Sequence, residues 1–283
     1  MSLKIEKAAG IGFCMGVRRA IDTLERVAGE RGGVETLGAV VHNRQVLRRL
    51  SEIGVRIVGS IDELQGNVIV ISSHGVGPQV EEEIRARNIE IIDTTCPFVK
   101  RAQVAARRLA DSGFLTIVFG DAEHPEVKGI LGWAGGRGMA AQDTGIFNDS
   151  DKLPRRLGLL SQTTQIPASF ARFARELIDC ALVNDSEMRI IDTICHDIRR
   201  RQADTLSLAE KSELVLVVGG HTSANSRHLL NLCSGVTQAY LIETADEIQA
   251  SWLKDKSRVG ITSGASTDEQ TIDEVVKRLE SMA

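Results

Sequence analysis

Three cysteines of this 283-residue sequence share a local pattern, and three thiolates that converge can hold a metal. Residues 91–96 (IIDTTC) and 190–195 (IIDTIC) resemble each other, each ends in a cysteine, and in both an arginine follows that cysteine by five residues and a glutamine by seven. A weaker third copy, 12–14 (GFC), also has an arginine five residues on. We predict a short strand before each cysteine and a helix after it, which places the three thiols at the carboxyl edges of α/β sheets, where ligands bind.

The three thiols, those of Cys14, Cys96 and Cys195, suit an iron–sulfur cluster better than a structural zinc ion. Structural zinc takes four protein ligands, usually with a close C-x-x-C pair, and the sequence contains no such pair. Ordinary 4Fe–4S electron carriers take four cysteines, so a set of three leaves one iron open for Lewis-acid chemistry on a substrate. Cys180 and Cys233 lie in apolar helical segments, and we expect both in the core.

Three of the six histidines, His42, His74 and His124, lie in loops after or close to apolar strands. A lone histidine is more often a hydrogen-bonded structural residue, but three in such loops can supply the several donors that a diphosphate needs. Glu126 follows His124 by two residues, and in a closed pocket its carboxyl group could pass protons. This group of residues predicts an anion pocket with a proton donor.

Three loops rich in glycine, serine and threonine follow predicted strands: 161–164 (SQTT), 219–226 (GGHTSANS) and 262–266 (TSGAS). Small and hydroxyl residues there leave backbone N–H groups available to a phosphate oxygen. Each loop by itself is better explained as a helix cap. The lysine and the G-x-x-x-x-G-K spacing of a Walker loop are missing from all three. Taken together, the loops favour an anion pocket.

The elements that position these residues are short aliphatic runs that alternate with amphipathic stretches. We predict strands at 3–8, 34–37, 55–58, 68–72, 89–93, 115–119, 157–160, 214–218, 239–242 and 259–262. We predict helices at 17–28, 44–53, 99–112, 168–181, 198–211 and 269–279. Strands this short and apolar, separated by helices, are typical of parallel sheets covered on both faces.

The predicted fold is therefore α/β, with three similar units of mostly parallel sheet in a pseudo-threefold arrangement around a central iron–sulfur cluster. We place the units at 1–96, 97–193 and 194–283, and the N-terminal strand could pack with the third unit. Between successive cysteines the chain is long enough for one modest α/β unit.

Composition excludes several classes of function. The formal net charge is −4 and the pI about 5.9, without a lysine- or arginine-dense tail, so we expect no nucleic-acid or anionic-membrane surface. No apolar run approaches the length of a membrane span, and the first ten residues have no signal-peptide core. An odd number of widely spaced cysteines argues against a disulfide framework. We expect a cytoplasmic protein.

Seven motifs, in order along nearly the whole chain, resemble those of the 4-hydroxy-3-methylbut-2-enyl diphosphate reductases, the IspH/LytB family. The motifs are GFCMGV at 12–17, VHN at 41–43, SSHGV at 72–76, DTTCP at 93–97, HPEV at 124–127, SQTT at 161–164 and SGAS at 263–266. The set is specific, although no single motif is. The resemblance implies a three-unit fold with a central 4Fe–4S cluster held by Cys14, Cys96 and Cys195, in an enzyme of the non-mevalonate isoprenoid pathway.

The resemblance also implies the reaction and the role of each pocket residue. Two electrons, delivered one at a time by ferredoxin or flavodoxin, remove the terminal hydroxyl of the substrate as water. Protonation at either end of the resulting allyl group then gives isopentenyl or dimethylallyl diphosphate. By position, Glu126 matches the proton donor, working with Thr163 and His124. The residues that match the diphosphate-binding set are His42, His74, His124, Thr163, Ser223, Asn225 and Ser266.

The chain departs from the family pattern at two places. Ala224 stands where many members carry a serine, which removes one hydroxyl donor and would weaken diphosphate binding by ~1–2 kcal/mol. Asp197 and Ile198 replace the small residue and the threonine that commonly follow the third cysteine. We expect Asp197 to cap the following helix, although an inward-facing carboxylate would lower the reduction potential of a cluster.

Three other readings stay open at this point. The first is a paralogue that uses the same cluster on a different allylic or hydroxylated substrate. This hypothesis is based on the altered segment after Cys195. A non-enzymatic iron–sulfur sensor or electron-transfer module would need neither a phosphate pocket nor Glu126. A structural zinc protein lacks a convincing fourth ligand.

Overall fold

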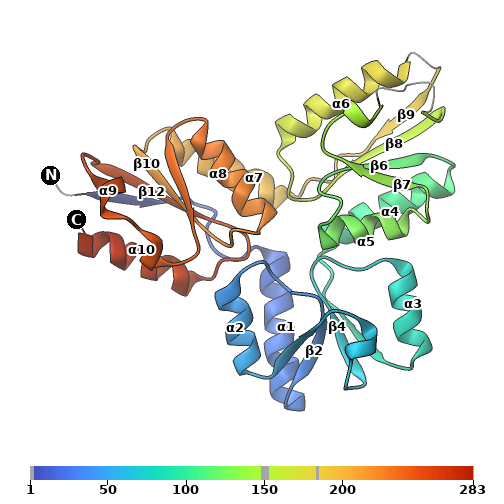
Figure 1. Cartoon of the computed structure of the whole chain (residues 1–283), viewed down its shortest axis with the longest axis horizontal. Coiled ribbons are helices and arrows are strands. Elements are labelled where there is room, and N and C mark those ends of the chain that lie inside the picture. Colours follow the sequence, from blue (N-terminus) through green and yellow to red (C-terminus); the bar gives the residue numbers. More distant parts are fainter. Residues whose placement is uncertain (1–2, 148–152, 183–184, 283) are drawn as a thin grey trace. The chain divides into compact units, whose positions relative to one another are not determined.

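The computed structural model describes residues 3–147, 153–182 and 185–282 of the chain. These residues form three sheets, each of four parallel strands, with helices between successive strands (Figure 1). The predicted α/β class, with three units of parallel sheet, is thereby confirmed. The chain divides into two compact units: unit 1 is Met1–Glu25, Ala39–Gly54 and His196–Ala283, and unit 2 is Arg26–Gly38 and Val55–Cys195. The finer division at 1–96, 97–193 and 194–283 stays a prediction.

Unit 1 contains one sheet, in which the N-terminal strand pairs with a strand from the far end of the chain. Its strands, in spatial order, are β1 (Lys4–Lys7), β12 (Arg258–Ser263), β10 (Leu214–Val218) and β11 (Gln238–Ile242). Every residue of β10 is buried, as expected for a central strand of a parallel sheet that helices cover on both faces.

Helices cover both faces of this sheet. They are α7 (His196–Ala209), α8 (Ala224–Ser234), α9 (Ala250–Leu253) and α10 (Glu269–Met282). Leu229 and Cys233 of α8 pack against Val215 and Val217 on one face, while Ile272 and Val275 of α10 belong to the apolar cluster of the other. Unit 1 also holds α2 (Arg44–Glu52) and the start of α1 (Met15–Arg31).

Unit 2 contains the other two sheets. The first has the order β3 (Val55–Val58), β2 (Val34–Leu37), β4 (Val68–Ile71) and β5 (Glu90–Asp93), and Ile84 of α3 (Pro78–Ala86) packs into its core. The second has the order β7 (Gly138–Ala141), β6 (Leu115–Phe119), β8 (Arg156–Ser161) and β9 (Glu187–Ile190). Short 3₁₀ turns occur in both units, at Ile61–Glu63, Gly145–Phe147 and Ala245–Glu247.

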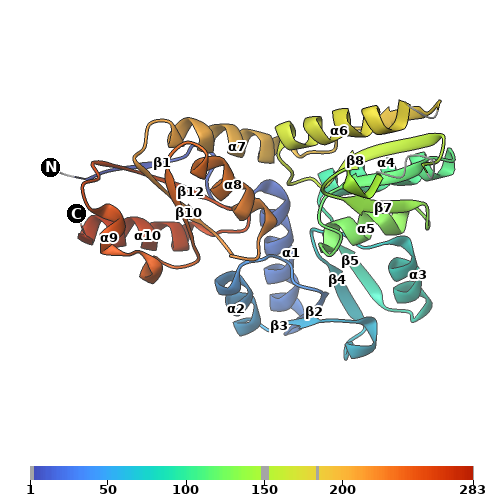
Figure 2. The same cartoon turned by 45° about the horizontal axis from the view of Figure 1, so that its top comes forward.

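The second sheet of unit 2 is sandwiched between helices. Those on one face are α4 (Pro97–Asp111) and α5 (Pro125–Trp133), and α6 (Pro167–Ala181) lies on the other (Figure 2). Phe170 and Phe173 of α6 contact Phe119 of β6, whereas Leu109 of α4 and Ile130 of α5 belong to the opposite cluster. The loops that contain predicted site residues follow the carboxyl ends of β6 and β8.

The structure corrects one predicted strand. Residues 12–14 form a loop rather than a strand, because Gly12 adopts a left-handed backbone with φ +86° that breaks extended structure. The strand that leads to Cys14 is β1, which ends at Lys7. None of the helices in the described ranges is both long enough and apolar enough to span a bilayer.

Candidate functional site

Cys14 directly precedes α1 and lies in a loop that is tied to the end of β12. The Gly12 N–H donates to Ser263 Oγ (2.9 Å), and the Cys14 N–H donates to the Ala265 carbonyl (3.1 Å). The Val17 N–H in the first turn of α1 points to the sulfur, with an N···Sγ distance of 3.5 Å. Burial raises the pKa of the Cys14 thiol, while this N–H and the positive charge of Arg201 act in the opposite direction.

Two glycine-containing strand ends pack closely around Ser226 of unit 1. A Cβ at Gly219, after β10, or at Gly264, after β12, would overlap the Ser226 hydroxyl. The loops are therefore restricted to glycine at these points, and the backbone approaches the start of α8 closely. Ser223 caps α8 by accepting from the Ser226 N–H (3.3 Å). The loop from 219 to 226 thus brings a helix N-terminus to the edge of the sheet, as the sequence predicted.

His42 lies against the same loop. A Cβ at Gly220 would overlap the His42 carbonyl oxygen, so the two segments are in contact. Burial lowers the pKa of the half-buried His42 imidazole, and the nearby charge of Arg227 lowers it further. The next residue, Asn43, caps α2 by accepting from the N–H groups of Gln45 (3.0 Å) and Val46 (3.2 Å).

Asn225 is a buried amide in the first turn of α8. Its side chain is only 4 % exposed, and within the described ranges neither amide atom has a hydrogen-bond partner. Leaving both atoms of a buried amide unsatisfied costs about 1–3 kcal/mol per group. Such an amide is expected where a polar ligand completes the site. Ser266, 8 % exposed, lies on the adjacent loop after β12.

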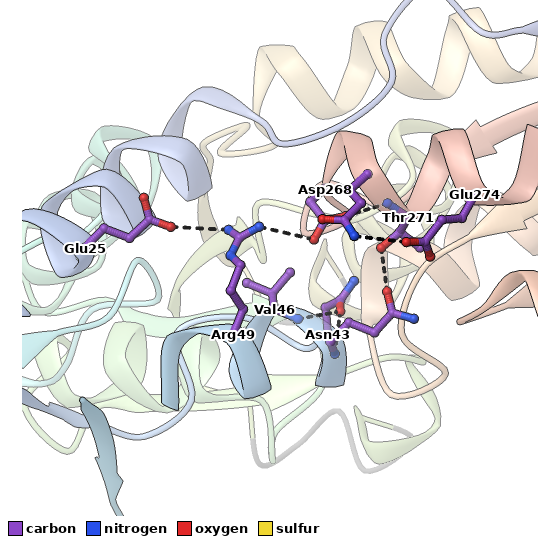
Figure 3. A network of polar contacts seen from close by, with 9 residues as sticks. Glu25, Asn43, Val46, Arg49, Asp268, Thr271 and Glu274 are labelled. Atoms are coloured by element: carbon purple, nitrogen blue, oxygen red, sulfur yellow. Dashed lines mark hydrogen bonds and ion pairs between the residues drawn. The ribbon is translucent and has the colours of Figure 1, made fainter. Parts of the chain in front are cut away.

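Arg49 of α2 forms ion pairs with α1 and with the segment ahead of α10 (Figure 3). From α2 its guanidinium contacts Glu25 of α1 (3.4 Å) and Asp268 ahead of α10 (3.6 Å). Asp268 also accepts from the Thr271 N–H (2.7 Å), and the Thr271 hydroxyl donates to Gln45 (2.5 Å). The network fixes the starts of α2 and α10, and hence the loops that carry His42 and Ser266.

Unit 2 contains the other two cysteines of the pattern, each just before a helix. Cys96 is the N-cap residue of α4, and its N–H donates to the Ser73 carbonyl (3.0 Å) in the His74 loop. Cys195 is buried directly before α7, and its N–H donates to the Thr163 carbonyl (3.0 Å). Each cysteine is therefore linked through the backbone to a loop with a predicted substrate-binding residue.

Glu126 and Thr163 form a buried acid–hydroxyl pair. Glu126 is 2 % exposed, its Oε1 accepts from the Thr163 N–H (2.6 Å), and its Oε2 accepts from the Thr163 hydroxyl (2.9 Å). Burial raises the pKa of Glu126 to about 7, although both hydrogen bonds favour the ionised form. A carboxyl group with this pKa is half protonated near neutral pH, which suits a proton donor.

His124 and His74 lie beside this pair. His124 caps α5 by accepting from the Glu126 N–H at Nδ1 (3.2 Å), and its ring meets that of His74 edge-on, with the centroids 5.3 Å apart. The His74 loop packs against α5 through glycines, since a Cβ at Gly132 would lie 2.9 Å from the Gly77 Cα. Unit 2 thus brings together His74, His124, Glu126 and Thr163, four of the predicted site residues.

Comparison with known proteins identifies the family to which this arrangement belongs. The family model described as LytB protein matches residues 5–280. The chain belongs to the LytB family. Proteins named 4-hydroxy-3-methylbut-2-enyl diphosphate reductase from Dehalococcoides mccartyi (strain CBDB1) and Geobacter sulfurreducens are similar to it, at 60 % and 37 % identity. The alignments cover 99 % of this chain and 99 % of the first relative, and 98 % and 97 % for the second.

Two solved structures agree with this LytB assignment. A reductase from Plasmodium falciparum, acting on E-1-hydroxy-2-methyl-but-2-enyl-4-diphosphate, has a TM-score of 0.89 at 26 % identity, covering 98 % of this chain and 88 % of the other. An (E)-4-hydroxy-3-methyl-but-2-enyl diphosphate reductase, described as the terminal enzyme of the non-mevalonate pathway, has a TM-score of 0.71 at 33 % identity and covers 99 % of both chains.

The thiols of this LytB chain are chemically suited to an iron–sulfur cluster. All five cysteines lie in the described ranges and none forms a disulfide there. Cys14, Cys96 and Cys195 each stand at a helix N-terminus, where N–H dipoles stabilise an anionic group. Cys233 is fully buried on α8, where burial raises its thiol pKa to about 12, and Cys180 is half-buried on α6. Position at a helix N-terminus, rather than within a helix, separates the three candidate ligands from these two cysteines.

Two residues that hold the His74 loop were not predicted from the sequence. Gln103 and Trp133 both donate to the Val76 carbonyl, two residues after His74, at 3.3 and 2.9 Å. The glutamine seven residues after Cys96 was visible in the repeat, but its partner was not. Asp197 lies inside the first turn of α7 rather than before it, so the expectation that it caps this helix is wrong.

Proposed function

We propose that this LytB chain is a 4-hydroxy-3-methylbut-2-enyl diphosphate reductase that produces isopentenyl and dimethylallyl diphosphate. Similarity over the full length to proteins of that name supports the assignment. The assignment depends most on the buried pair of Glu126 and Thr163, because the Thr163 carbonyl also accepts a hydrogen bond from the backbone N–H of Cys195. Thr163 therefore connects the proposed proton donor to a candidate metal ligand by hydrogen bonds, which fits a reduction that ends in protonation.

We further propose that Cys14, Cys96 and Cys195 hold a 4Fe–4S cluster with one iron open to substrate. When bound, the cluster would supply single electrons and a Lewis-acid site for the departing hydroxyl group. Ferredoxin or flavodoxin is the proposed electron donor. Thiols without disulfides suit a reducing compartment, and we propose a cytoplasmic location.

The remaining chemistry belongs to residues of the chain. Removing a hydroxyl group as water consumes two electrons and two protons, one proton for the leaving oxygen and one for the allyl carbon. In the proposal the protonated carboxyl of Glu126 donates through the Thr163 hydroxyl to which it is hydrogen-bonded. His124 fixes the Glu126 backbone through its Nδ1, which keeps the carboxyl aimed at Thr163. Burial of the pair excludes water from the proton path.

We propose that the diphosphate is bound by His42, His74, His124, Thr163, Ser223, Asn225 and Ser266. The unsatisfied amide of Asn225 and the helix N-terminus at Ser223 support this role, since both can donate to phosphate oxygens. Ala224 occupies the first position of α8 and contributes only its backbone N–H there. The charge of Arg227, close enough to lower the pKa of His42, would add electrostatic attraction for an anion.

Asn225→Ala is expected to raise KM for the diphosphate about 10- to 100-fold, because lost hydrogen bonds to a charged group cost about 1.5–3 kcal/mol. The melting temperature should not fall, since the wild-type amide makes no bond in the described protein that the variant would lose. Steady-state kinetics and a thermal melt without ligand check both parts. A lower melting temperature with unchanged KM would assign Asn225 to folding instead.

The function is tested by anaerobic purification and assay. The protein should be brown, with roughly four irons per chain, and should convert the hydroxylated five-carbon diphosphate to the two isomeric products with a reduced one-electron dye. Colourless protein with one zinc would contradict the cluster. A brown protein that leaves this diphosphate unchanged but reduces another allylic alcohol would indicate a paralogue. Brown protein without turnover of any such alcohol would indicate a sensor or an electron carrier.

A further inference from the structure

Arg201 is a buried cation on α7 that the proposed reaction does not use. It is 5 % exposed, whereas its neighbour Arg200 is exposed to solvent. Its Nη2 donates to the Gly12 carbonyl (2.7 Å), two residues before Cys14. Its Nη1 donates to the carbonyl (2.9 Å) and hydroxyl (3.4 Å) of Ser263. One planar guanidinium thus bridges the Cys14 loop and the end of β12.

The acceptors of Arg201 are neutral, which is unusual for a buried guanidinium. Two are carbonyl oxygens and one is a hydroxyl, so the hydrogen bonds do not neutralise the charge. Burying a cation is unfavourable unless an anion lies near it. Burial accordingly lowers the pKa of Arg201, while the charges of Cys14, Asp197 and Asp204 act in the opposite direction. The carboxylates of Asp197 and Asp204 supply negative charge near Arg201, and its hydrogen bonds hold the Cys14 loop to the end of β12.

The corresponding position in the other two helices is apolar. Six residues after Cys14 and Cys96 stand Ala20 and Ala102, both fully buried. This position therefore faces the interior in all three copies of the pattern. A charge occurs in the copy after Cys195 alone, which argues that packing does not require an arginine there.

We propose that Arg201 is a positioning residue of the iron–sulfur site: it clamps the Cys14 loop to β12 and provides a positive charge beside the cluster. The inference rests on the proposed function. The clamp also affects the proposed diphosphate loop, because Ser263, Ala265 and Ser266 belong to one segment. Within it, the Ala265 carbonyl accepts from the Cys14 N–H. Loss of the clamp should therefore disturb both the cluster ligand and the diphosphate loop.

The experiment compares Arg201→Met, Arg201→Lys and the exposed control Arg200→Ala as anaerobically reconstituted holoenzymes. Arg201→Met should release iron to a chelator at least tenfold faster than wild type. Its midpoint potential, from a dye-mediated titration followed by electron paramagnetic resonance, should shift to a more negative value. Arg201→Lys keeps the positive charge but lacks the planar guanidinium that binds both acceptors at once. It should retain the wild-type potential and release iron at least threefold faster. Arg200→Ala should match wild type in both measurements.

Wild-type iron release and potential in Arg201→Met would overturn the proposal, even with reduced activity. If Arg201→Met fails to fold, as judged by circular dichroism, Arg201→Lys decides: faster iron release at unchanged potential supports the clamp, and wild-type iron release overturns it. A potential that shifts equally in Arg200→Ala would assign the effect to net charge and also overturn the proposal. Wild-type protein without iron would overturn the proposed function as well, so the two failures are distinguishable.

Discussion

Alanine at Cys14, Cys96 or Cys195 is expected to remove the iron–sulfur cluster and with it all measurable turnover. Each thiol stands directly before a helix and, in the proposed site, supplies one of three protein ligands. A three-ligand set has no spare member, so loss of one leaves two irons without a protein thiolate. Iron and sulfide per chain, with the visible spectrum of anaerobically reconstituted protein, measure the effect.

Cys180→Ala is the matched control for these substitutions. Cys180 is half-buried on α6, within unit 2, and replacing it deletes a sulfur of the same size without touching a loop of the site. Iron content and turnover should stay at the wild-type level. Cys233→Ala makes a second control, but its thiol is fully buried, so a loss of about 1 kcal/mol of stability is expected with unchanged iron content. Full iron content in any variant of the three ligands would remove that cysteine from the site.

The fold could be predicted because its central strands are apolar on both faces. The strands β6, β8, β10 and β12 are aliphatic runs whose bounds the sequence predicted to within a residue. The strand β7 was missed, and β9 was predicted only as the strand before Cys195, because both lie at sheet edges and are partly or mostly exposed. β7 is rich in glycine and alanine and β9 contains glutamate and arginine, so neither has the run of β-branched residues that is typical of a strand.

Helix α5 shows how packing outweighs local propensity. Gly129 and Gly132 make its sequence a poor helix former, and it was not among the predicted helices. Gly132 is needed because a Cβ there would lie 2.9 Å from the Gly77 Cα in the His74 loop, and Gly129 packs against Gly75 of the same loop. Tertiary contact therefore determines this helix, and the sequence offered only the proline at its first turn as a signal.

Candidate site residues could be predicted where the type of side chain by itself indicates a chemical role. Histidines, hydroxyl residues and Glu126 stand out in loops, and the structure places them at strand and helix ends. Arg201 could not be assigned a role, because its partners Gly12 and Ser263 are 189 and 62 residues away in the sequence. A surface arginine and a buried one look the same until the topology brings their acceptors together.

Glu126→Gln is expected to lower turnover about 100- to 10,000-fold while KM for the diphosphate changes only a few-fold. The amide preserves the size of the carboxyl group and can still accept from the Thr163 N–H, but it has no proton to transfer. In wild-type enzyme the donor must be protonated, so turnover should decline as the pH rises through about 7. The dye-coupled assay between pH 6 and 9 should show this decline in wild type and none in the variant. The exposed neighbour Glu123→Gln is the control and should keep the wild-type profile.

The same substitution should stabilise the protein at alkaline pH. The pKa of Glu126 is about 7 in the folded protein and near 4.5 when unfolded, so the folded state binds more protons between these values. Its contribution to stability is fully present below pH 4.5 and is lost as the pH rises to about 7, a loss of about 3 kcal/mol. Glutamine cannot ionise, so Glu126→Gln should melt several degrees above wild type at pH 8 and close to it at pH 5. Equal melting temperatures at pH 8 would mean that burial does not raise the pKa of this carboxyl, and the assignment of Glu126 as proton donor would lose its physical basis.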